Sequence, residues 1–349
     1  MRGIGNYTPH LFKGVRVTMS ADTYTPESIA EAVKQYDGLK RKKTIGNIVK
    51  TFHIENTDVI ASFGEDAAVI RNGYSALLLA ADGIWSQLMD LDPYWAGYCS
   101  ILVNVHDIAA MGGRPIAMVD VLSISNDELM EKVTKGMCDA AKAFDVPIVG
   151  GHLHPDAPHN VIDVSILGIT ELDNVIYSSK AEPGNAIIIA IDLNGRIHPN
   201  ARMNWDSVTM KDPELLRSQI AVMKKLGELH LLTAGKDISN PGLIGTLGML
   251  LESSGTGGVV DLTSIPSPDL DDLGIGLEQW VRMYPGMGFI MTANQESVDE
   301  VCKIFRNVHM AARVIGTVTD TRKLILQKGN DETTLFNFCV EGITNITNI

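Results

Sequence analysis

Short apolar runs alternate with longer amphipathic segments along the first half of the chain. One helix is predicted from Asp92 to Met111, with Pro93 at its first position, and another after the capping box at residues 125–128. Between and around them lie aliphatic and β-branched runs that end at Gly, Asn or Asp, which is typical of strands. These runs cover residues 67–70, 75–81, 115–124, 147–149 and 161–169. The order predicts a mixed α/β domain over residues 60–177.

The second half of the chain repeats this mixture. Turn-forming residues gather at 178–184, before the apolar run 186–191, and they predict a domain boundary. Helices are expected from Pro213, from Pro241 to about Glu252, and near residues 277–283. Further strands are expected at residues 259–262, 289–292, 312–318 and 324–327. We therefore expect a second domain over residues 178–349.

Residues 1–59 are predicted to form a helical extension. Pro26 can open a helix that runs to about Tyr36. Four apolar residues then recur at the spacing of one helix face: Ile45, Ile48, Val49 and Phe52. The basic run at residues 40–43 is interpreted as a solvated turn in preference to a phosphate site, because runs of charge usually face water.

The charge and cysteine content narrow the function classes. Lys and Arg number 29 against 42 Asp and Glu, so the formal net charge is −13 and the overall field repels polyanions. Nucleic acid and membrane surfaces are therefore not expected partners. The four cysteines form no C-x-x-C pair, which argues against structural zinc and a disulfide framework. No apolar run is long enough to span a membrane, and we expect a cytoplasmic protein.

Carboxylates gather where predicted strands begin or end. Glu65 and Asp66 enter one strand, and Asp82 follows an almost wholly apolar one. Carboxylates that share a strand-end surface repel one another, and Mg²⁺, which prefers oxygen ligands, converts that repulsion into coordination. The sequence therefore predicts a metal site here, with a simple turn cap as the alternative for Asp82.

A second group of candidates lies on and after the helix that ends at Met111. Asn104 and Asp107 are three residues apart, so they are expected to share a helix face and point together at a ligand or a metal-bound phosphate. Gly112 and Gly113 would allow close approach of a ligand to the backbone, and Arg114 could meet an anion. A helix C-cap with an incidental surface arginine is the alternative.

Histidines cluster in the segment after the predicted strand at residues 147–149. Gly150 and Gly151 could admit a nucleotide or substrate close to the backbone, and His152 or His154 could contact the acceptor. Together with Asp156 and His159 these histidines could instead bind a transition metal. Ordinary hydrogen-bonded loop histidines are the third interpretation.

One candidate anion site lies in the second half. Asn240 is expected to cap a helix whose first amides form an anion site, and Asp237 stands beside it to hold a cation. The familiar G-x-x-x-x-G-K-[ST] and G-x-G-x-x-G phosphate loops are missing from the sequence. Any use of ATP is therefore expected on another scaffold.

Taken together, these motifs resemble the aminoimidazole ribonucleotide (AIR) synthase superfamily over roughly residues 60–320. That superfamily includes thiamine-monophosphate kinase, selenophosphate synthetase and the hydrogenase-maturation carbamoyl dehydratase. Residues 103–113 carry the most specific likeness, and the chain looks most like the AIR synthase-related group that includes methanogenesis marker protein 2. The resemblance implies an α+β fold of two α/β-sandwich-like domains. It also implies a homodimer in which the N-terminal domains form a β-barrel with ATP-binding clefts at its edges.

The resemblance also implies site residues. By position, five acids match the Mg²⁺ and phosphate-coordinating residues of the family: Glu65, Asp66, Asp82, Asp107 and Asp237. Asn104 matches a nucleotide-site residue. Glu65 stands where kinase and dehydratase members have Asp, and Asn240 stands where the kinase pattern has a second Asp, so a full kinase set of metal ions is not implied.

We therefore predict an enzyme that depends on ATP and Mg²⁺ and transfers a phosphoryl group to an oxygen of a small-molecule acceptor, or activates that oxygen. The catalytic candidates are Asp82, Asp107, His152 and His154. The nucleotide-binding candidates are Gly64, Asn104, Gly112, Gly113, Arg114, Gly150, Gly151 and Asn240. The alternatives are a non-catalytic nucleotide-binding dimer that acts as a partner in cofactor assembly, and a histidine-centred metallohydrolase.

Overall fold

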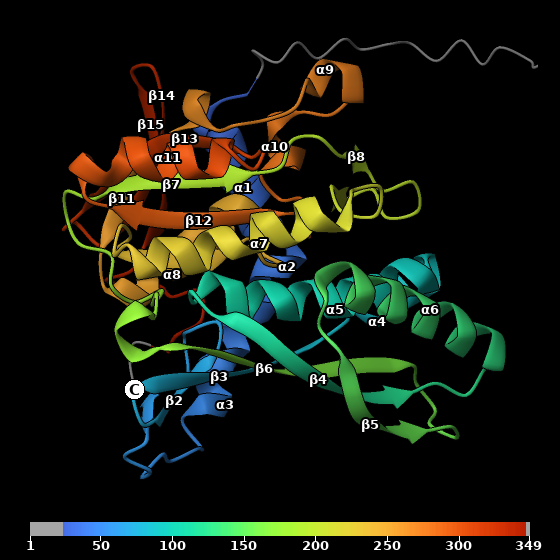
Figure 1. Ribbon diagram of the computed structural model, residues 1–349. Coiled ribbons are helices and arrows are strands. Elements are labelled where there is room, and N and C mark those ends of the chain that lie inside the picture. Colours follow the sequence, from blue (N-terminus) through green and yellow to red (C-terminus); the bar gives the residue numbers. More distant parts are fainter. Residues whose placement is uncertain (1–23, 347–349) are drawn as a thin grey trace, which may run out of the picture.

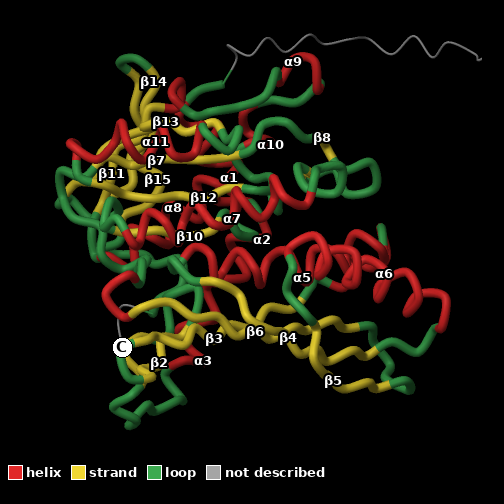
Figure 2. Tube along the Cα trace, viewed as in Figure 1, coloured by secondary structure: helices red, strands yellow, loops and turns green. Residues whose placement is uncertain are grey.

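The structure, a computed structural model, describes residues 24–346 as two sheets with helices packed between them (Figure 1). Five long helices account for most of the helical layers: α5 (Pro93–Ala110), α6 (Asp127–Phe144), α7 (Pro213–Glu228), α8 (Gly242–Ser254) and α11 (Val298–Arg306). Helices α5 and α6 cover one face of the first sheet (Figure 2). Helices α7 and α11 pack on the face of the second sheet that shares a core with α5, and α8 covers its opposite face together with α1.

The first sheet has six strands in the order β1-β2-β3-β6-β4-β5. They are β1 (Val59–Ala61), β2 (Ala68–Asn72), β3 (Ser75–Gly83), β4 (Arg114–Ser123), β5 (Ile148–His154) and β6 (Val161–Glu171). The sheet is open in a single chain, with β1 and β5 at its edges. Alternation along β3 buries Ala76 and Leu78 under α5 and leaves Leu79 46% exposed on the opposite face.

The second sheet has seven strands in the order β10-β12-β7-β13-β11-β14-β15. They are β7 (Ala186–Ile191), β10 (Ala234–Asp237), β11 (Gly257–Asp261), β12 (Gly288–Ala293), β13 (Ala311–Thr319), β14 (Lys323–Lys328) and β15 (Asp331–Asn337). Every residue of β7 and β12 is buried, because helices cover both faces at the centre of this sheet.

The remaining elements complete the described chain. They are α1 (Pro26–Gln35), α2 (Asp37–Lys40), η1 (Arg41–Thr44), α3 (Ile45–Val49), α4 (Ser86–Leu91), α9 (Leu270–Leu273), α10 (Leu277–Trp280), the 3₁₀ turns η2 (Leu172–Asn174), η3 (Leu262–Ser264) and η4 (Gln295–Ser297), and the two-stranded ribbon β8 (Arg196–Ile197) and β9 (Trp205–Asp206). No helix within residues 24–346 is both long and apolar enough to cross a membrane.

The N-terminal segment packs on the second sheet although it precedes the first in sequence. Helix α1 contacts β14, β15 and α10, and the amide of Gly46 in α3 donates to the carbonyl oxygen of Thr344 at 2.9 Å. Residues 1–23 of the expected N-terminal extension lie outside the described part of the chain. The described part of that extension therefore packs on the second half of the chain and is not a separate appendage.

Most predicted elements are present, and the differences have local causes. Asn126, not Ser125, caps α6, because its side chain accepts the amide of Leu129 at 2.8 Å. The expected helix through Phe52 ends at Val49, and Ile48 and Phe52 are 57% and 58% exposed. Strand β15 and helix α11 are absent from the sequence-based prediction.

Candidate functional site

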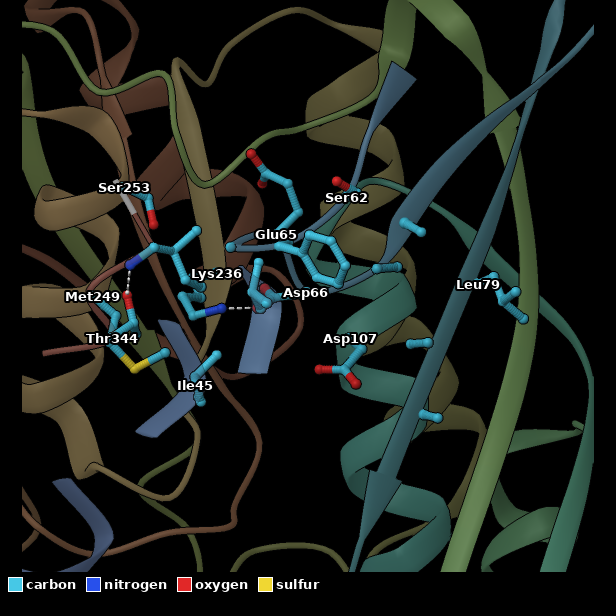
Figure 3. Close-up of a pocket in the computed structure, with 18 of the residues that line it drawn as sticks. Ile45, Ser62, Glu65, Asp66, Leu79, Asp107, Lys236, Met249, Ser253 and Thr344 are labelled. Atoms are coloured by element: carbon cyan, nitrogen blue, oxygen red, sulfur yellow. Dashed lines mark hydrogen bonds and ion pairs between the residues drawn. The ribbon is translucent and has the colours of Figure 1, made fainter. Parts of the chain in front are cut away.

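The candidate site is a cavity of about 600 Å³ between the two sheets, with acidic residues at one end (Figure 3). We call it the larger cavity. Asp66 comes from the turn before β2, Asp82 from the end of β3, Asp107 from α5 and Asp237 from the end of β10. Four carboxylates that lie far apart in the sequence thus reach one space because both sheets end beside it.

Three of these carboxylates are placed to hold one metal ion. Asp66, Asp107 and Asp237 each offer an oxygen atom within 4.8 Å of the other two. Within residues 24–346 this is the one group of three or more His, Cys, Asp or Glu side chains so placed. All of its donors are carboxylate oxygens, so the residues present fit Mg²⁺.

Burial and mutual repulsion disfavour the ionised form of this cluster. Asp107 and Asp237 are 8% and 3% exposed, and burial raises the pKa of both carboxyls. Asp82 lines the cavity. Burial of its carboxyl by the surrounding protein raises the pKa of Asp82 to about 6, and the positive charge of Lys42 opposes this shift. A divalent cation would relieve these costs, because it stabilises the charged form of every carboxylate that it contacts.

Lys236 places a positive charge inside the same cluster. Its ammonium pairs with the carboxylate of Asp66, as the dashed line in Figure 3 shows, and both side chains are almost fully buried. Burial lowers the pKa of Lys236. The amide of Asp237 also lies 3.4 Å from Asp66 Oδ2. Asp66 is therefore held by groups from the second sheet and joins the two halves of the site.

Glu65 lines the larger cavity but lies outside the three-carboxylate group. Its carboxylate accepts hydrogen bonds from the amide and hydroxyl of Ser178, at 2.5 and 2.9 Å, and from the hydroxyl of Ser179 at 2.5 Å. Gly64, with φ of +102°, forms the turn that directs this side chain and also lines the cavity. In this structure Glu65 anchors the segment that connects the two sheets.

Asn104 does not join Asp107 at the cavity. It is fully buried, and its Nδ2 donates to the carbonyl oxygen of Ser100, one turn earlier in α5, at 2.8 Å. Its Oδ1 has no partner among the described residues. The expectation that these two side chains point together at a ligand is wrong for this chain, because α5 is buried on nearly every side and only Asp107 reaches the opening.

Gly112 and Gly113, which follow α5, allow close packing of the backbone against neighbouring segments. A side chain on Gly112 would meet the carbonyl oxygen of Asn174, and one on Gly113 would meet Leu78. Arg114 is exposed at the start of β4, where its side chain reaches only the adjacent Pro115 carbonyl at 3.5 Å. None of the three lines a cavity that contains the acids.

The histidine segment lies at the opposite edge of the first sheet. Strand β5 runs on through Gly150 and Gly151 to His154, so the residues expected in a loop form an exposed edge strand. The rings of His152 and His154 lie 4.6 Å apart. Neither they nor His159 line the larger cavity, and no third metal-binding side chain joins them within the described residues.

Asn240 is not the cap of α8. The helix begins at Gly242, whose φ of +72° differs from that of a helix interior, and Pro241 occupies the cap position. The amide of Ser239 donates to the hydroxyl of Thr246, while Asn240 Oδ1 is buried against Gly38 without a hydrogen-bond partner. The expected anion site at the start of this helix therefore lacks the asparagine cap on which it was based.

The basic run that was interpreted as a solvated turn contributes two residues to the site. Lys42 lines the larger cavity, and both Arg41 and Lys42 line a smaller cavity of about 260 Å³ that joins it at Asp82 and Asp237. The sequence around residues 40–43 could not predict this position, because it depends on long-range contacts. Helix α1 packs on the second sheet, and the Gly46 amide donates to the carbonyl oxygen of Thr344.

Sequence profiles and solved structures show what this chain is similar to. Residues 64–170 match the profile described as AIR synthase related protein, N-terminal domain, and residues 182–329 match that of the C-terminal domain. The uncharacterized protein MJ0640 of Methanocaldococcus jannaschii is 45% identical over 91% of this chain and 98% of its own length.

Two solved structures share the fold at low sequence identity. T. maritima PurL complexed with ADP superposes with a TM-score of 0.73 at 19% identity, over 91% of this chain and 51% of that one. AaThiL complexed with AMPPCP and TMP superposes with a TM-score of 0.62 at 19% identity, over 83% of this chain and 95% of that one. This chain therefore spans about half the length of PurL and nearly the whole of AaThiL.

Proposed function

The chain belongs to the AIR synthase-related family, and from that premise we propose that it is an ATP- and Mg²⁺-dependent enzyme that transfers the γ-phosphoryl group to an oxygen of a small molecule. The observation that carries the proposal is the convergence of Asp66, Asp107 and Asp237, from both sheets, on one cavity. T. maritima PurL complexed with ADP and AaThiL complexed with AMPPCP have the same fold, which supports a nucleotide as the occupant.

Different residues around the cavity would have different roles in this reaction. Asp66, Asp107 and Asp237 would hold Mg²⁺, which when bound neutralises charge on the transferred phosphoryl group. Lys236 supplies a further positive charge beside Asp66. The acceptor oxygen bonds to the γ-phosphorus while the bond to the β,γ-bridging oxygen breaks and ADP leaves. A proton released by an acceptor hydroxyl passes to the carboxylate of Asp82, at the junction of the two cavities.

Calorimetric titration of the full chain with ATP tests this proposal. We expect saturable binding with Mg²⁺ present and a loss of at least about a hundredfold in affinity with a chelator, because four bare carboxylates repel a triphosphate. ADP formation should then depend on an added acceptor. Equal binding with and without divalent ions would contradict the metal site, and binding with acceptor-independent, slow turnover would favour the non-catalytic dimer.

The same titration has an expected pH dependence. The pKa of Asp82 is about 6 and those of Asp107 and Asp237 are also raised, so lowering the pH from 8 to 5.5 adds protons to the cluster and weakens Mg-ATP binding. Folding stability of the metal-free protein should change with pH in the opposite direction, so that lowering the pH stabilises the fold. A carboxyl with a raised folded-state pKa stabilises below its unfolded pKa and loses that contribution as the pH rises through its folded pKa.

We propose in addition that two copies of the chain pair through the first sheet. Its face away from α5 and α6 exposes four large aliphatic side chains: Leu79, Val119, Val121 and Val149. Such a patch on a folded domain marks an interface. Val121→Asp should convert a dimer into monomers in sedimentation analysis, whereas Tyr74→Asp, at a 95% exposed position in the β2–β3 turn, should not. A wild-type monomer at micromolar concentration would contradict this pairing.

A further inference from the structure

The smaller cavity continues the larger one past the acid cluster. It has a volume of about 260 Å³ and shares Lys42, Ile45, Asp82, Asp237 and Ser239 with the larger cavity. Its remaining wall comes from the α2–η1 turn, the start of α4, helix α5 and the segment before β12. A molecule bound there would lie beside Asp82 and Asp237, where the two cavities join.

Two cations of the basic turn face this space without a neutralising partner. Neither Arg41 nor Lys42 forms an ion pair within residues 24–346, whereas Lys40, in the same run, pairs with Asp37 at 3.8 Å. The guanidinium of Arg41 lies 5.0 Å from the ring centroid of Trp85, which also lines the cavity. Stacking on an aromatic face orients the fork of an arginine and leaves its N–H groups free to bind an anion.

The rest of the wall is mainly apolar. Ile84, Leu88 and Val103 lie there with the aromatic rings of Trp85 and Tyr284. Among residues 24–346, the acids in the wall are Asp82 and Asp237, at the junction with the larger cavity. Cys99 is part of the wall but not a nucleophile, because burial raises the pKa of its thiol well above the ordinary value. The end of the cavity away from the metal cluster thus combines apolar surface with positive charge.

We propose that the smaller cavity is the acceptor site and that the acceptor is a small molecule with a phosphate or carboxylate group, which Arg41 binds. Lys42, which lines both cavities, lies between that group and the nucleotide phosphates. This inference rests on the proposed function and adds the chemical class of the acceptor. A bidentate guanidinium–anion contact orients the acceptor, so that its free oxygen faces the γ-phosphorus beside Asp82.

The test uses the full chain saturated with Mg²⁺ and AMPPNP, which fills the nucleotide site. The probes are inorganic phosphate, glycerol 3-phosphate and citrate, with glycerol as the uncharged control, and binding is followed by calorimetry. We expect at least one anion to bind saturably and glycerol not to bind. Arg41→Met should weaken that binding at least about tenfold, because it removes a charge-assisted contact. Preference for the phosphate compounds or for citrate identifies the anionic group.

Matched variants distinguish a failure of the acceptor site from a failure of the proposed nucleotide site. Lys43→Met removes an exposed cation of the same turn that lines neither cavity, and it should leave anion affinity unchanged. Arg41→Met should keep AMPPNP affinity within about twofold, since Arg41 lines only the smaller cavity. Failure of every anion to bind, or equal anion affinity in wild type and Arg41→Met, overturns the acceptor site alone. Failure of the wild type to bind Mg-AMPPNP overturns the proposed function.

Discussion

Asp107→Asn is expected to weaken Mg²⁺-dependent ATP binding at least about a hundredfold, the largest functional effect that we predict for a single substitution. Asp107 is one of three carboxylates whose oxygens lie within 4.8 Å of each other, and it is the member that comes from α5. Asparagine keeps the shape of the side chain but supplies a neutral oxygen. The metal site loses one negative charge, while its geometry is preserved.

The same substitution is expected to raise the stability of the metal-free protein. Burial and the nearby charges of Asp82 and Asp237 raise the pKa of Asp107, so its ionised form is unfavourable in the fold. A neutral amide removes that repulsion, for a gain of about 1 kcal/mol in the free energy of unfolding. Lost binding together with a higher melting temperature distinguishes an effect on the site from a folding defect.

Titration with Mg-ATP and thermal denaturation in chelator provide the two measurements for Asp107→Asn. The matched control is Asp173→Asn, which removes an exposed carboxylate outside both cavities and should change neither quantity. Wild-type affinity in Asp107→Asn would remove this residue from the metal site. Lost affinity with a lower melting temperature would attribute the loss to misfolding.

Glu252→Ala is expected to cause the largest loss of stability, about 3 kcal/mol. Glu252 lies at the end of α8 and is only 3% exposed. Its carboxylate accepts the amides of Ile343, Thr344 and Asn345 at 3.0, 2.9 and 3.1 Å, and the Thr344 hydroxyl at 2.9 Å. Alanine leaves these four donors without their acceptor in a largely buried place.

Denaturant unfolding and amide hydrogen exchange can check this loss. The amides of residues 343–345 should exchange faster in Glu252→Ala, and that of Gly46 should follow, because it donates to the Thr344 carbonyl. Glu341→Ala serves as the control, since Glu341 is half exposed and pairs with Lys34 at 3.4 Å, an interaction worth under about 1 kcal/mol. Equal losses in both variants would argue against the role of Glu252.

The acids that cluster in the cavity could be found from sequence because the positions of strand ends are readable. Asp66 precedes and Asp82 ends a strand whose apolar run is readable, and sheets bring strand ends together. Asp237 ends β10, which has no apolar run, so its placement depends on its position before a predicted helix and on the family resemblance. Asn104 was misplaced for the opposite reason. Helix α5 is apolar on nearly every side, so periodicity does not distinguish the face that meets the cavity from the faces that meet protein.

The basic turn could not be placed from sequence because its surroundings are distant in the chain. Lys42 lines the same cavities as Asp82 and Asp237 because α1 packs against β14 and β15 and Gly46 donates to Thr344. Those contacts depend on tertiary packing, which a short run of charged residues does not predict. The general preference of charge runs for water agrees with the exposure of Lys40, Arg41 and Lys43, but it does not reveal that Arg41 and Lys42 line cavities beside the acids.

The hydrogen bonds of Glu65 to Ser178 and Ser179 fasten the turn that carries Asp66 to the segment that connects the two sheets. The chain passes from the first sheet to the second through these serines, and the residue after Glu65 is the metal-site carboxylate of Asp66. Any displacement of the connecting segment would therefore reach Asp66 through a single peptide bond. The position of this carboxylate is set by both halves of the chain at once, because Lys236 holds its other side.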